Sequence, residues 1–306
     1  MISDDLPVPF GVPQGSRLGP LLFTLYTANL ISNVRTNFPE ISCHCYADDT
    51  QLYVSFRPDE HAKERCVSLL ETCVDYVRGW MLQNRLMLND GKTELMIIGT
   101  PKQTSKINLN SVSIGDSVIE PSVSARNLGV QFDSNLNMRE HITNVCKSAY
   151  YMIYNLRRIR KYLDKDITKD IVHACITNKL DYCKGLLYGI PVSQIVRLQR
   201  VQNTCARLIC GCSKFTRITP ILRNLHWLPV RQRITFKILL IVYKALLGQA
   251  PTYIKELLNF KLNQHNRNLR SSRDTLLLLI LSIEHLLVRP QNYGIICHLK
   301  SGNHHL

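Results

Sequence analysis

The sequence predicts an α+β domain followed by an all-helical region, and three features support this fold class. Up to about residue 136, short runs rich in β-branched and aromatic residues alternate with amphipathic stretches. From Asn137 onward, apolar residues recur at helical spacing almost throughout. Residues 1–150 hold 13 Lys or Arg and 16 Asp or Glu, a net −3, whereas residues 151–306 hold 25 and 7, a net +18. Because pattern and charge change in the same part of the chain, we expect two regions.

The first region is expected to begin with a helix and a hairpin. An apolar stretch at 21–30 predicts a helix that is entered through Pro20. Two β-prone runs follow at 41–46 and 51–56, and the polar residues between them predict a tight hairpin. Two adjacent aspartates lie at the tip of that hairpin.

A long helix and further short strands complete the α+β region. Between residues 62 and 81 the apolar residues follow a three-and-four spacing, which predicts an amphipathic helix that covers one face of a sheet. Asn89-Asp90-Gly91 marks a turn after this helix. Strands are expected at 95–98, 112–114 and 128–132.

The second region reads as a series of helices with Pro and Gly at their ends. The expected helices cover 138–162, 166–179, 192–210, 229–247 and 252–259. In the third of these, Arg197, Arg200 and Arg207 fall roughly opposite the apolar stripe. A basic outer face suits the backbone of a nucleic acid, and it equally suits an ordinary solvated helix. The +18 half favours nucleic acid as the partner.

Composition excludes several classes of protein. The 306 residues are 45% hydrophobic, which is enough for a buried core. Eleven cysteines form an odd count without a regular framework, and no secretory signal is expected, so we predict reduced thiols in the nucleus or cytoplasm. Cys205, Cys210 and Cys212 lack further ligands at zinc spacing and are interpreted as core residues. The apolar run 276–281 is too short to span a bilayer, so no membrane partner is expected.

The segment Tyr46-Ala47-Asp48-Asp49 is the main candidate for chemistry. Two carboxylates on one turn offer hard oxygen ligands for divalent ions. Two such ions about 3.5 to 4 Å apart can activate an attacking oxygen and stabilise a leaving phosphate. That arrangement needs carboxylates from more than one element. Taken alone, a turn with paired acids is common and is often only solvated.

Other motifs surround this turn in a definite order. Gly11-Val12-Pro13-Gln14-Gly15-Ser16 precedes it by about thirty residues, and Lys92-Thr93-Glu94 and then Leu128-Gly129-Val130 follow it. In this order and spacing they resemble the palm motifs of reverse transcriptases from LINE-type, non-LTR retrotransposons. The resemblance extends from about residue 10 to about residue 260. Its later segments are Leu180-Asp181-Tyr182-Cys183, Leu198-Gln199-Arg200-Val201-Gln202-Asn203 and Leu225-His226-Trp227-Leu228-Pro229-Val230.

The resemblance implies a partial right-hand polymerase palm followed by a helical thumb, and it implies roles for individual residues. Asp48 and the weaker second carboxylate, Asp49, would hold Mg²⁺, and Lys92 would protonate the departing pyrophosphate. RNA template, DNA primer or duplex, and deoxynucleotide triphosphates would be the partners. Substrates would lie against Gly11, Pro13, Gln14, Gly15, Ser16, Tyr46, Ala47, Leu128 and Gly129. For the last two, a simple β-turn is the alternative.

Nucleic-acid binding is expected beyond the catalytic motifs as well. The basic run Arg157-Arg158-Ile159-Arg160-Lys161 lies where a thumb would follow. It could hold phosphates or act as a nuclear-import patch. A helix end that is rich in cations is the alternative. The candidates for backbone contact are Arg157, Arg158, Arg160, Lys161, Arg197, Arg200 and Arg207.

The family pattern also contains parts that we do not find here. Relatives carry fingers and a palm strand with another obligatory metal-binding aspartate, tens of residues before the Pro-Gln-Gly-Ser loop, whereas ten residues precede Gly11. We therefore expect a chain truncated at its amino end, inactive alone, with an uncovered sheet edge. The expected regions are a partial palm at 1–136, a helical thumb and basic extension at 137–260, and a divergent tail at 261–306. Polymerase, non-catalytic nucleic-acid-binding module and unselected relic remain open as functions.

Overall fold

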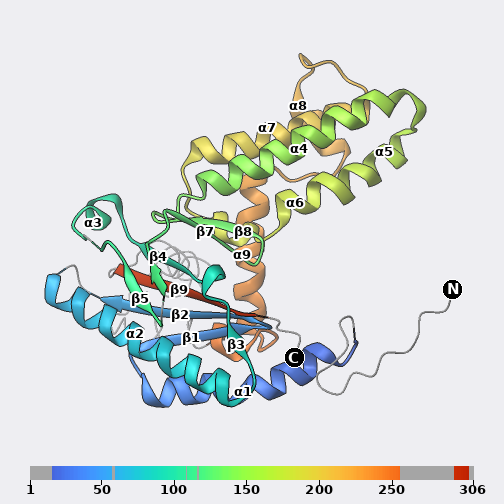
Figure 1. Cartoon of the computed structure of the whole chain (residues 1–306). Coiled ribbons are helices and arrows are strands. Elements are labelled where there is room, and N and C mark those ends of the chain that lie inside the picture. The colour runs from blue at the N-terminus through green and yellow to red at the C-terminus, as the bar shows by residue number, and fades with distance from the viewer. Residues whose placement is uncertain (1–15, 57–58, 108, 116, 256–292, 303–306) are drawn as a thin grey trace. The chain divides into compact units, whose positions relative to one another are not determined.

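The computed structural model describes most of the chain as two compact units (Figure 1). The first unit comprises 1–125, 133–136 and 290–306, and the second comprises 126–132 and 137–289. Each unit is considered by itself. The described residues are 16–56, 59–107, 109–115, 117–255 and 293–302.

An antiparallel sheet forms the centre of the first unit. The expected hairpin is present, with β1 (Ile41–Tyr46) paired to β2 (Asp49–Phe56). A strand from the far end of the chain, β9 (Tyr293–Gly302), pairs with β2 on one side and with β4 (Glu94–Ile98) on the other. The two residues of β3 (Met87–Leu88) pair with the end of β9.

The position of β9 differs from the expected organisation of the chain. Residues 261–306 were interpreted as a divergent tail, and one part of this segment, β9, lies inside the sheet between β2 and β4. Its Cys297 and Leu299 are fully buried in the core. Residues 293–302 therefore belong to the amino-terminal unit, although the two units also divide between residues 136 and 137.

Two long helices cover one face of this sheet (Figure 1). The helix α1 (Gly19–Asn37) has Pro20 in its first turn, as expected, and buries Leu30 and Val34. The helix α2 (Glu60–Gln83) begins at Asp59, whose carboxylate accepts a hydrogen bond of 2.8 Å from the Ala62 N–H. The apolar stripe of α2 forms the core together with the inward side chains of β2, β4 and β9.

Short elements complete the first unit. Arg78 of α2 forms an ion pair of 2.7 Å with Asp90 and also donates to the Ile114 carbonyl, so it links the helix to the segments that follow it. These segments are the 3₁₀ turn Asp90–Lys92, β4, the single-turn helix α3 (Pro101–Thr104), and the hairpin of β5 (Val112–Ile114) with β6 (Ser117–Ile119). The strands β7 (Ser124–Asn127) and β8 (Val130–Asp133) follow as a second hairpin, whose residues 126–132 belong to the second unit.

The second unit is helical, as the sequence predicts. Its helices are α4 (Arg139–Ile159), α5 (Lys165–Val172), α6 (Asn178–Asp181), α7 (Val192–Cys210), α8 (Ile218–Asn224) and α9 (Val230–Leu246). A π-helical turn (His173–Thr177) joins α5 to α6, and 3₁₀ turns cover Arg160–Tyr162 and Lys184–Leu187. The helix α8 was not predicted. The expected helix at 252–259 lies largely outside the described residues.

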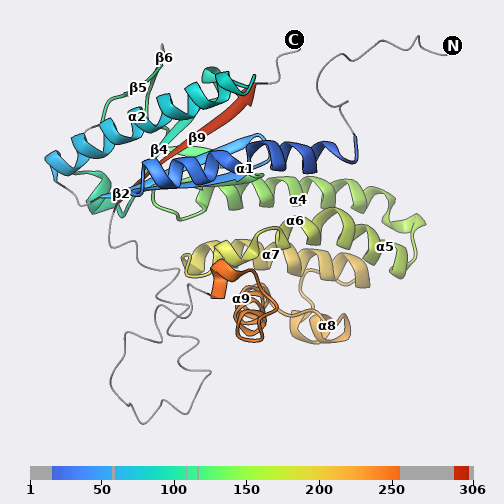
Figure 2. The same cartoon turned by 90° about the horizontal axis from the view of Figure 1, so that it is seen from below.

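The core of this unit lies between α4 and α7, which run side by side (Figure 2). Ile142 and Ile153 from α4 meet Leu198, Val201 and Ile209 from α7, and all five side chains are at most 1% exposed. The apolar stripe expected on residues 192–210 is thus the buried face of α7. All eleven cysteines are free thiols. Within the described residues, no helix is long and apolar enough to cross a membrane.

We expect the first unit to depend on β9 for its stability. Replacing the buried Leu299 by alanine should lower the free energy of unfolding by about 2–5 kcal/mol, because the change leaves a cavity between sheet and helix. Leu82→Ala on α2 is the matched control, since Leu82 is 57% exposed, and should change stability by no more than about 0.5 kcal/mol. Denaturant unfolding of the full chain measures both. Equal effects of the two substitutions would contradict the central placement of β9.

Candidate active-site turn and nucleic-acid interface

The Tyr-Ala-Asp-Asp segment forms the two-residue turn of the β1–β2 hairpin. Tyr46 and Asp49 are the last cross-strand pair, so Ala47 and Asp48 make the turn itself. Asp48 is exposed and Asp49 is half-buried at the start of β2. The structure therefore places two neighbouring carboxylates at one end of the sheet, beside the 66% exposed ring of Tyr46.

The turn contains a strained residue. Ala47 has a φ of 51°, in the left-handed region that residues with a β-carbon seldom adopt. Such backbone conformations cost about 1–3 kcal/mol and are concentrated at functional sites. The observed strain at Ala47 is consistent with a turn whose geometry serves the acidic pair.

The sheet has a face that the helices α1 and α2 do not cover. Alternation along β2 turns Thr50, Leu52 and Val54 toward the helices. Asp49 and Gln51 point to the other face, and their cross-strand partners Tyr46 and His44 are exposed there. This polar face of the hairpin begins at the acidic turn.

The structure brings Lys92 to the same end of the sheet. Gln51 of β2, His298 of β9 and Glu94 of β4 lie in one row of the ladder. Since β2 and β4 run in the same direction, Lys92 and Asp49 each lie two residues before that row. β9 is the strand between β2 and β4. Lys92 is exposed at the end of its 3₁₀ turn.

The acidic turn offers the type of ligand that a magnesium ion prefers, but it offers too few ligands for a two-ion site. Carboxylate oxygens are hard ligands of the type that Mg²⁺ prefers. Within the residues that the structure describes, however, no group of three or more His, Cys, Asp or Glu side chains could hold a metal ion. The described residues thus offer two of the carboxylates that a two-ion site needs, and we derive no catalytic step from them alone.

Most of the expected substrate loop cannot be located. Gly11, Pro13, Gln14 and Gly15 lie outside the described residues. Ser16 is described, and its hydroxyl accepts a hydrogen bond of 3.3 Å from the Leu18 N–H at the start of α1. Its observed contacts are therefore with the helix that follows.

Leu128 and Gly129 form a tight turn between β7 and β8. Both have positive φ, 45° and 82°, which is the backbone of a mirror-image hairpin turn. The Tyr182 hydroxyl donates a hydrogen bond of 2.6 Å to the Leu128 carbonyl, and a β-carbon on Gly129 would lie 3.5 Å from the Tyr182 ring. The structure thus shows a β-turn at these residues, and their contact with a substrate stays a prediction. The sequence motif that contains Tyr182 did not indicate this contact with the Leu128 turn.

The three later motifs have structural contacts. Asp181 accepts hydrogen bonds from Arg233 of α9 and forms an ion pair of 3.4 Å with Lys184. Gln202, which is 1% exposed, donates to the Leu228 carbonyl at 2.8 Å. Gln199 accepts a hydrogen bond of 2.8 Å from the Val230 N–H at the start of α9. These motifs therefore join α6, α7 and α9 into one body.

Three arginines that were predicted to contact nucleic acid form hydrogen bonds within the second unit instead. The guanidinium of Arg160 donates to the carbonyls of Leu163, Leu208 and Ile209, at 2.7, 3.0 and 2.9 Å. It therefore satisfies carbonyls at the carboxyl end of α7, where a cation is also favoured by the helix dipole. This position corrects the expectation that Arg160 faces phosphates.

Arg197 and Arg207 are also half-buried and bonded within the chain. Arg197 donates to Gln194 at 2.9 Å and to Thr143 at 3.0 Å, and Arg207 donates to the Thr216 carbonyl at 3.2 Å. Both arginines were expected on an outer face opposite the apolar stripe, but their side chains are only partly exposed. The predicted cations that remain exposed are Arg157, Arg158, Lys161 and Arg200.

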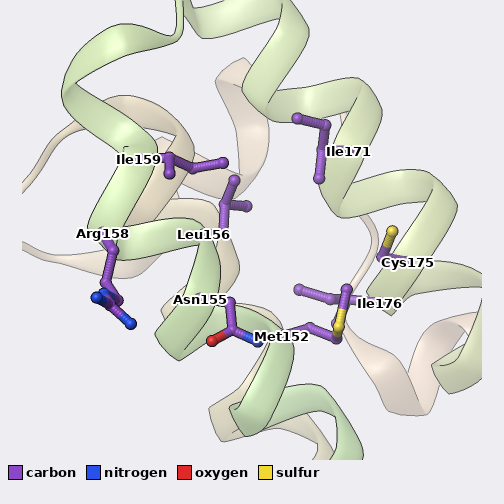
Figure 3. Close-up of a pocket in the computed structure, with 8 residues that line it drawn as sticks. All are labelled: Met152, Asn155, Leu156, Arg158, Ile159, Ile171, Cys175 and Ile176. Carbon is purple, nitrogen blue, oxygen red and sulfur yellow. The ribbon is translucent and has the colours of Figure 1, made fainter.

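A cavity of about 480 Å³ lies beside the basic run, between α4 and α5 (Figure 3). Its walls are mainly apolar, with Met152 and Ile159 on α4 opposite Ile171 and Cys175. Arg158 and Asn155 supply the polar groups on the α4 side. The groove thus adjoins the exposed cations of α4.

Comparison with known proteins finds a family that matches part of the chain. Residues 4–132 match the family described as reverse transcriptase (RNA-dependent DNA polymerase). The chain is thus similar to the reverse transcriptases of non-LTR retrotransposons. It is 27% identical over 237 residues to a probable RNA-directed DNA polymerase from the transposon X-element of Drosophila melanogaster, with 73% of this chain covered. The sequence-based resemblance is confirmed.

Other relatives are also RNA-directed DNA polymerases of mobile elements. A probable RNA-directed DNA polymerase from the transposon BS of Drosophila melanogaster is 26% identical over 236 residues, covering 74% of this chain and 25% of that protein. The RNA-directed DNA polymerase from the mobile element jockey of Drosophila funebris is 27% identical over 228 residues, covering 69% and 23%. The chain spans about a quarter of the length of these reverse transcriptase relatives. No solved structure matches it.

Ala47→Gly should stabilise the acidic turn. Glycine adopts a φ of 51° without a steric penalty, so the free energy of unfolding should rise by roughly 1 kcal/mol despite the greater entropy of the unfolded chain. The measurement is denaturant unfolding beside Ala62→Gly, a control in the first turn of α2, where glycine is unfavourable. A loss of stability at both positions would show that Ala47 is not strained in the folded protein.

Tyr182→Phe should loosen the Leu128–Gly129 turn. The substitution removes the donor to the Leu128 carbonyl but keeps the ring, so stability should fall by about 1 kcal/mol. Amide hydrogen exchange should accelerate at the β7–β8 turn. Tyr243→Phe, at an exposed tyrosine of α9, is the control and should leave that exchange unchanged.

Proposed function

We propose that this chain contributes the Asp48–Asp49 turn to the nucleotidyl-transfer site of an RNA-directed DNA polymerase. The observation that carries the proposal is the tight β1–β2 turn, which holds two adjacent carboxylates at the end of a hairpin whose polar face is not covered by α1 or α2. The likeness to polymerases of the X-element, BS and jockey supports the same activity. The substrates we propose are an RNA template, a DNA primer and deoxynucleotide triphosphates.

Each residue of the turn has a distinct task in this proposal. Asp48 and Asp49 would hold Mg²⁺, which when bound supplies charge stabilisation for the transferred phosphoryl group. Tyr46, exposed beside them, lines the path of the nucleic acid. Lys92 lies at the same end of the sheet and, as an ammonium, can donate a proton to the leaving pyrophosphate.

We further propose that the carboxylates of this turn are insufficient alone. Two ions need ligands from more than one element, whereas Asp48 and Asp49 come from a single turn. A further aspartate must then be supplied by residues outside the described ones or by another chain. Without it, charge stabilisation of the phosphoryl group is lost and templated synthesis by the 306-residue chain should be negligible.

Primer extension on an RNA template with magnesium tests both statements. The chain alone should extend no better than its Asp48→Asn variant. A chimera that adds the fingers and first palm strand of a relative should extend primers, and Asp48→Ala should reduce its rate by about 10³-fold or more. Asp75→Ala, at an exposed carboxylate of α2, is the matched control and should retain the rate. Extension by the chimera that survives Asp48→Ala would refute the metal assignment.

A second candidate function is nucleic-acid binding by the helical unit without catalysis. The observation in its favour is the exposure of Arg157, Arg158 and Lys161 at the end of α4, within a half-chain of net charge +18. Phosphate contacts of this kind release counterions and need no base sequence. This function is independent of the acidic turn.

Salt dependence measures those contacts. Replacing Arg157, Arg158 and Lys161 by glutamine should weaken duplex DNA binding and flatten the plot of log affinity against log salt by roughly 2 to 3, since each contact contributes about 0.9. The matched control replaces Arg231, Lys237 and Lys244, three exposed cations on α9, and should leave the slope unchanged. Equal flattening by both triple variants would indicate a diffuse positive charge in place of a defined interface.

A further inference from the structure

The exposed side of α4 has an unusual composition. From Lys147 to Tyr162 the chain contains no acidic residue. The exposed side chains in this stretch are cations, tyrosines and one isoleucine: Lys147, Tyr150, Tyr151, Tyr154, Arg157, Arg158, Ile159, Lys161 and Tyr162. We name the four cations and four tyrosines of this group the α4 tyrosine face.

We propose that the α4 tyrosine face binds single-stranded nucleic acid, with bases stacked on the tyrosines and phosphates held by the cations. The proposal rests on the second candidate function and names the form of nucleic acid that the helical unit prefers. It does not depend on the acidic turn or on metal binding.

Geometry places these side chains together. At about 100° per residue, Lys147, Tyr150, Tyr151, Tyr154, Arg157 and Arg158 fall within an arc of about 120°. The opposite side of the helix is the buried one that packs on α7. From Lys147 to Lys161 the face is about 21 Å long, at about 1.5 Å per residue. A strand laid along α4 would therefore meet one cation, then three rings, then a group of cations.

The rings are available for stacking. Tyr151, Tyr154 and Tyr162 are 66%, 62% and 75% exposed, although an aromatic ring normally buries most of its surface. The ammonium of Lys161 lies 4.7 Å from the centroid of the Tyr162 ring, so cation and ring already form one contact surface. Several exposed rings in a field of positive charge match the stacking platforms of proteins that bind single strands.

The combination of cations and aromatic rings indicates which kind of partner fits the α4 tyrosine face. An apolar protein partner would cover the tyrosines but would leave four cations unpaired, whereas a nucleic acid satisfies both groups. Duplex offers phosphates but keeps its bases stacked within the helix, so only an unpaired strand can use the rings. The groove lined by Met152 and Ile171 opens beside Arg158 and extends the apolar part of this surface (Figure 3).

The test compares labelled oligothymidylate with a duplex of the same length, by fluorescence anisotropy on the full chain. Tyr151→Ala combined with Tyr154→Ala should weaken single-strand binding by about tenfold or more, because each stacked base contributes about 1–3 kcal/mol. Duplex binding and the salt slope should change little, since no cation is removed. Tyr151→Phe combined with Tyr154→Phe keeps both rings and should bind almost as the wild-type chain does.

Tyr243→Ala on α9 is the matched control, because Tyr243 is 59% exposed on another helix of the same unit. It should leave single-strand affinity unchanged. Wild-type affinity in the double alanine variant, or an equal loss for single strand and duplex, would overturn the proposal while leaving nucleic-acid binding intact. No binding of either nucleic acid by the wild-type chain at low salt would refute the second candidate function together with this proposal.

Discussion

The amino-terminal unit depends on the pairing of β9 with β2 and β4. Backbone N–H and C=O groups that lose water must find partners, and β9 provides the ladder for both of its neighbours. Its buried Cys297 and Leu299 also complete the core beneath α1 and α2. The distance between the acidic turn and Lys92 follows from the same constraint, because β9 is the strand that separates them.

The helical unit is held by polar contacts at the ends of its helices. Gln202 satisfies a carbonyl before α9, Arg160 satisfies carbonyls at the end of α7, and Tyr182 holds the turn at Leu128. A buried polar group without a partner costs about 1–3 kcal/mol, so each contact has a stability role independent of nucleic acid. Motifs shared with reverse transcriptases thus include residues that maintain the fold as well as residues proposed for chemistry.

The two proposed activities draw on different physical properties of the chain. Nucleotidyl transfer needs several carboxylates at fixed positions, and the strained turn at Ala47 supplies one pair. Nucleic-acid binding needs only exposed cations and rings on a rigid support, which α4 provides through its packing on α7. The second activity therefore tolerates an incomplete metal site, whereas the first does not.

Local patterns in the sequence were sufficient for the β1–β2 hairpin, for α2, α4 and α7, and for the position of Asp48 and Asp49, because period and turn chemistry act over a few residues. Tertiary structure alone decided the rest. The partners of β9 lie about 200 to 250 residues earlier in the chain, so its short apolar run carried no local sign of a central strand. Likewise, Arg160 and Arg158 are near neighbours with the same charge, and only the approach of the α7 carbonyls separates a structural cation from an exposed one.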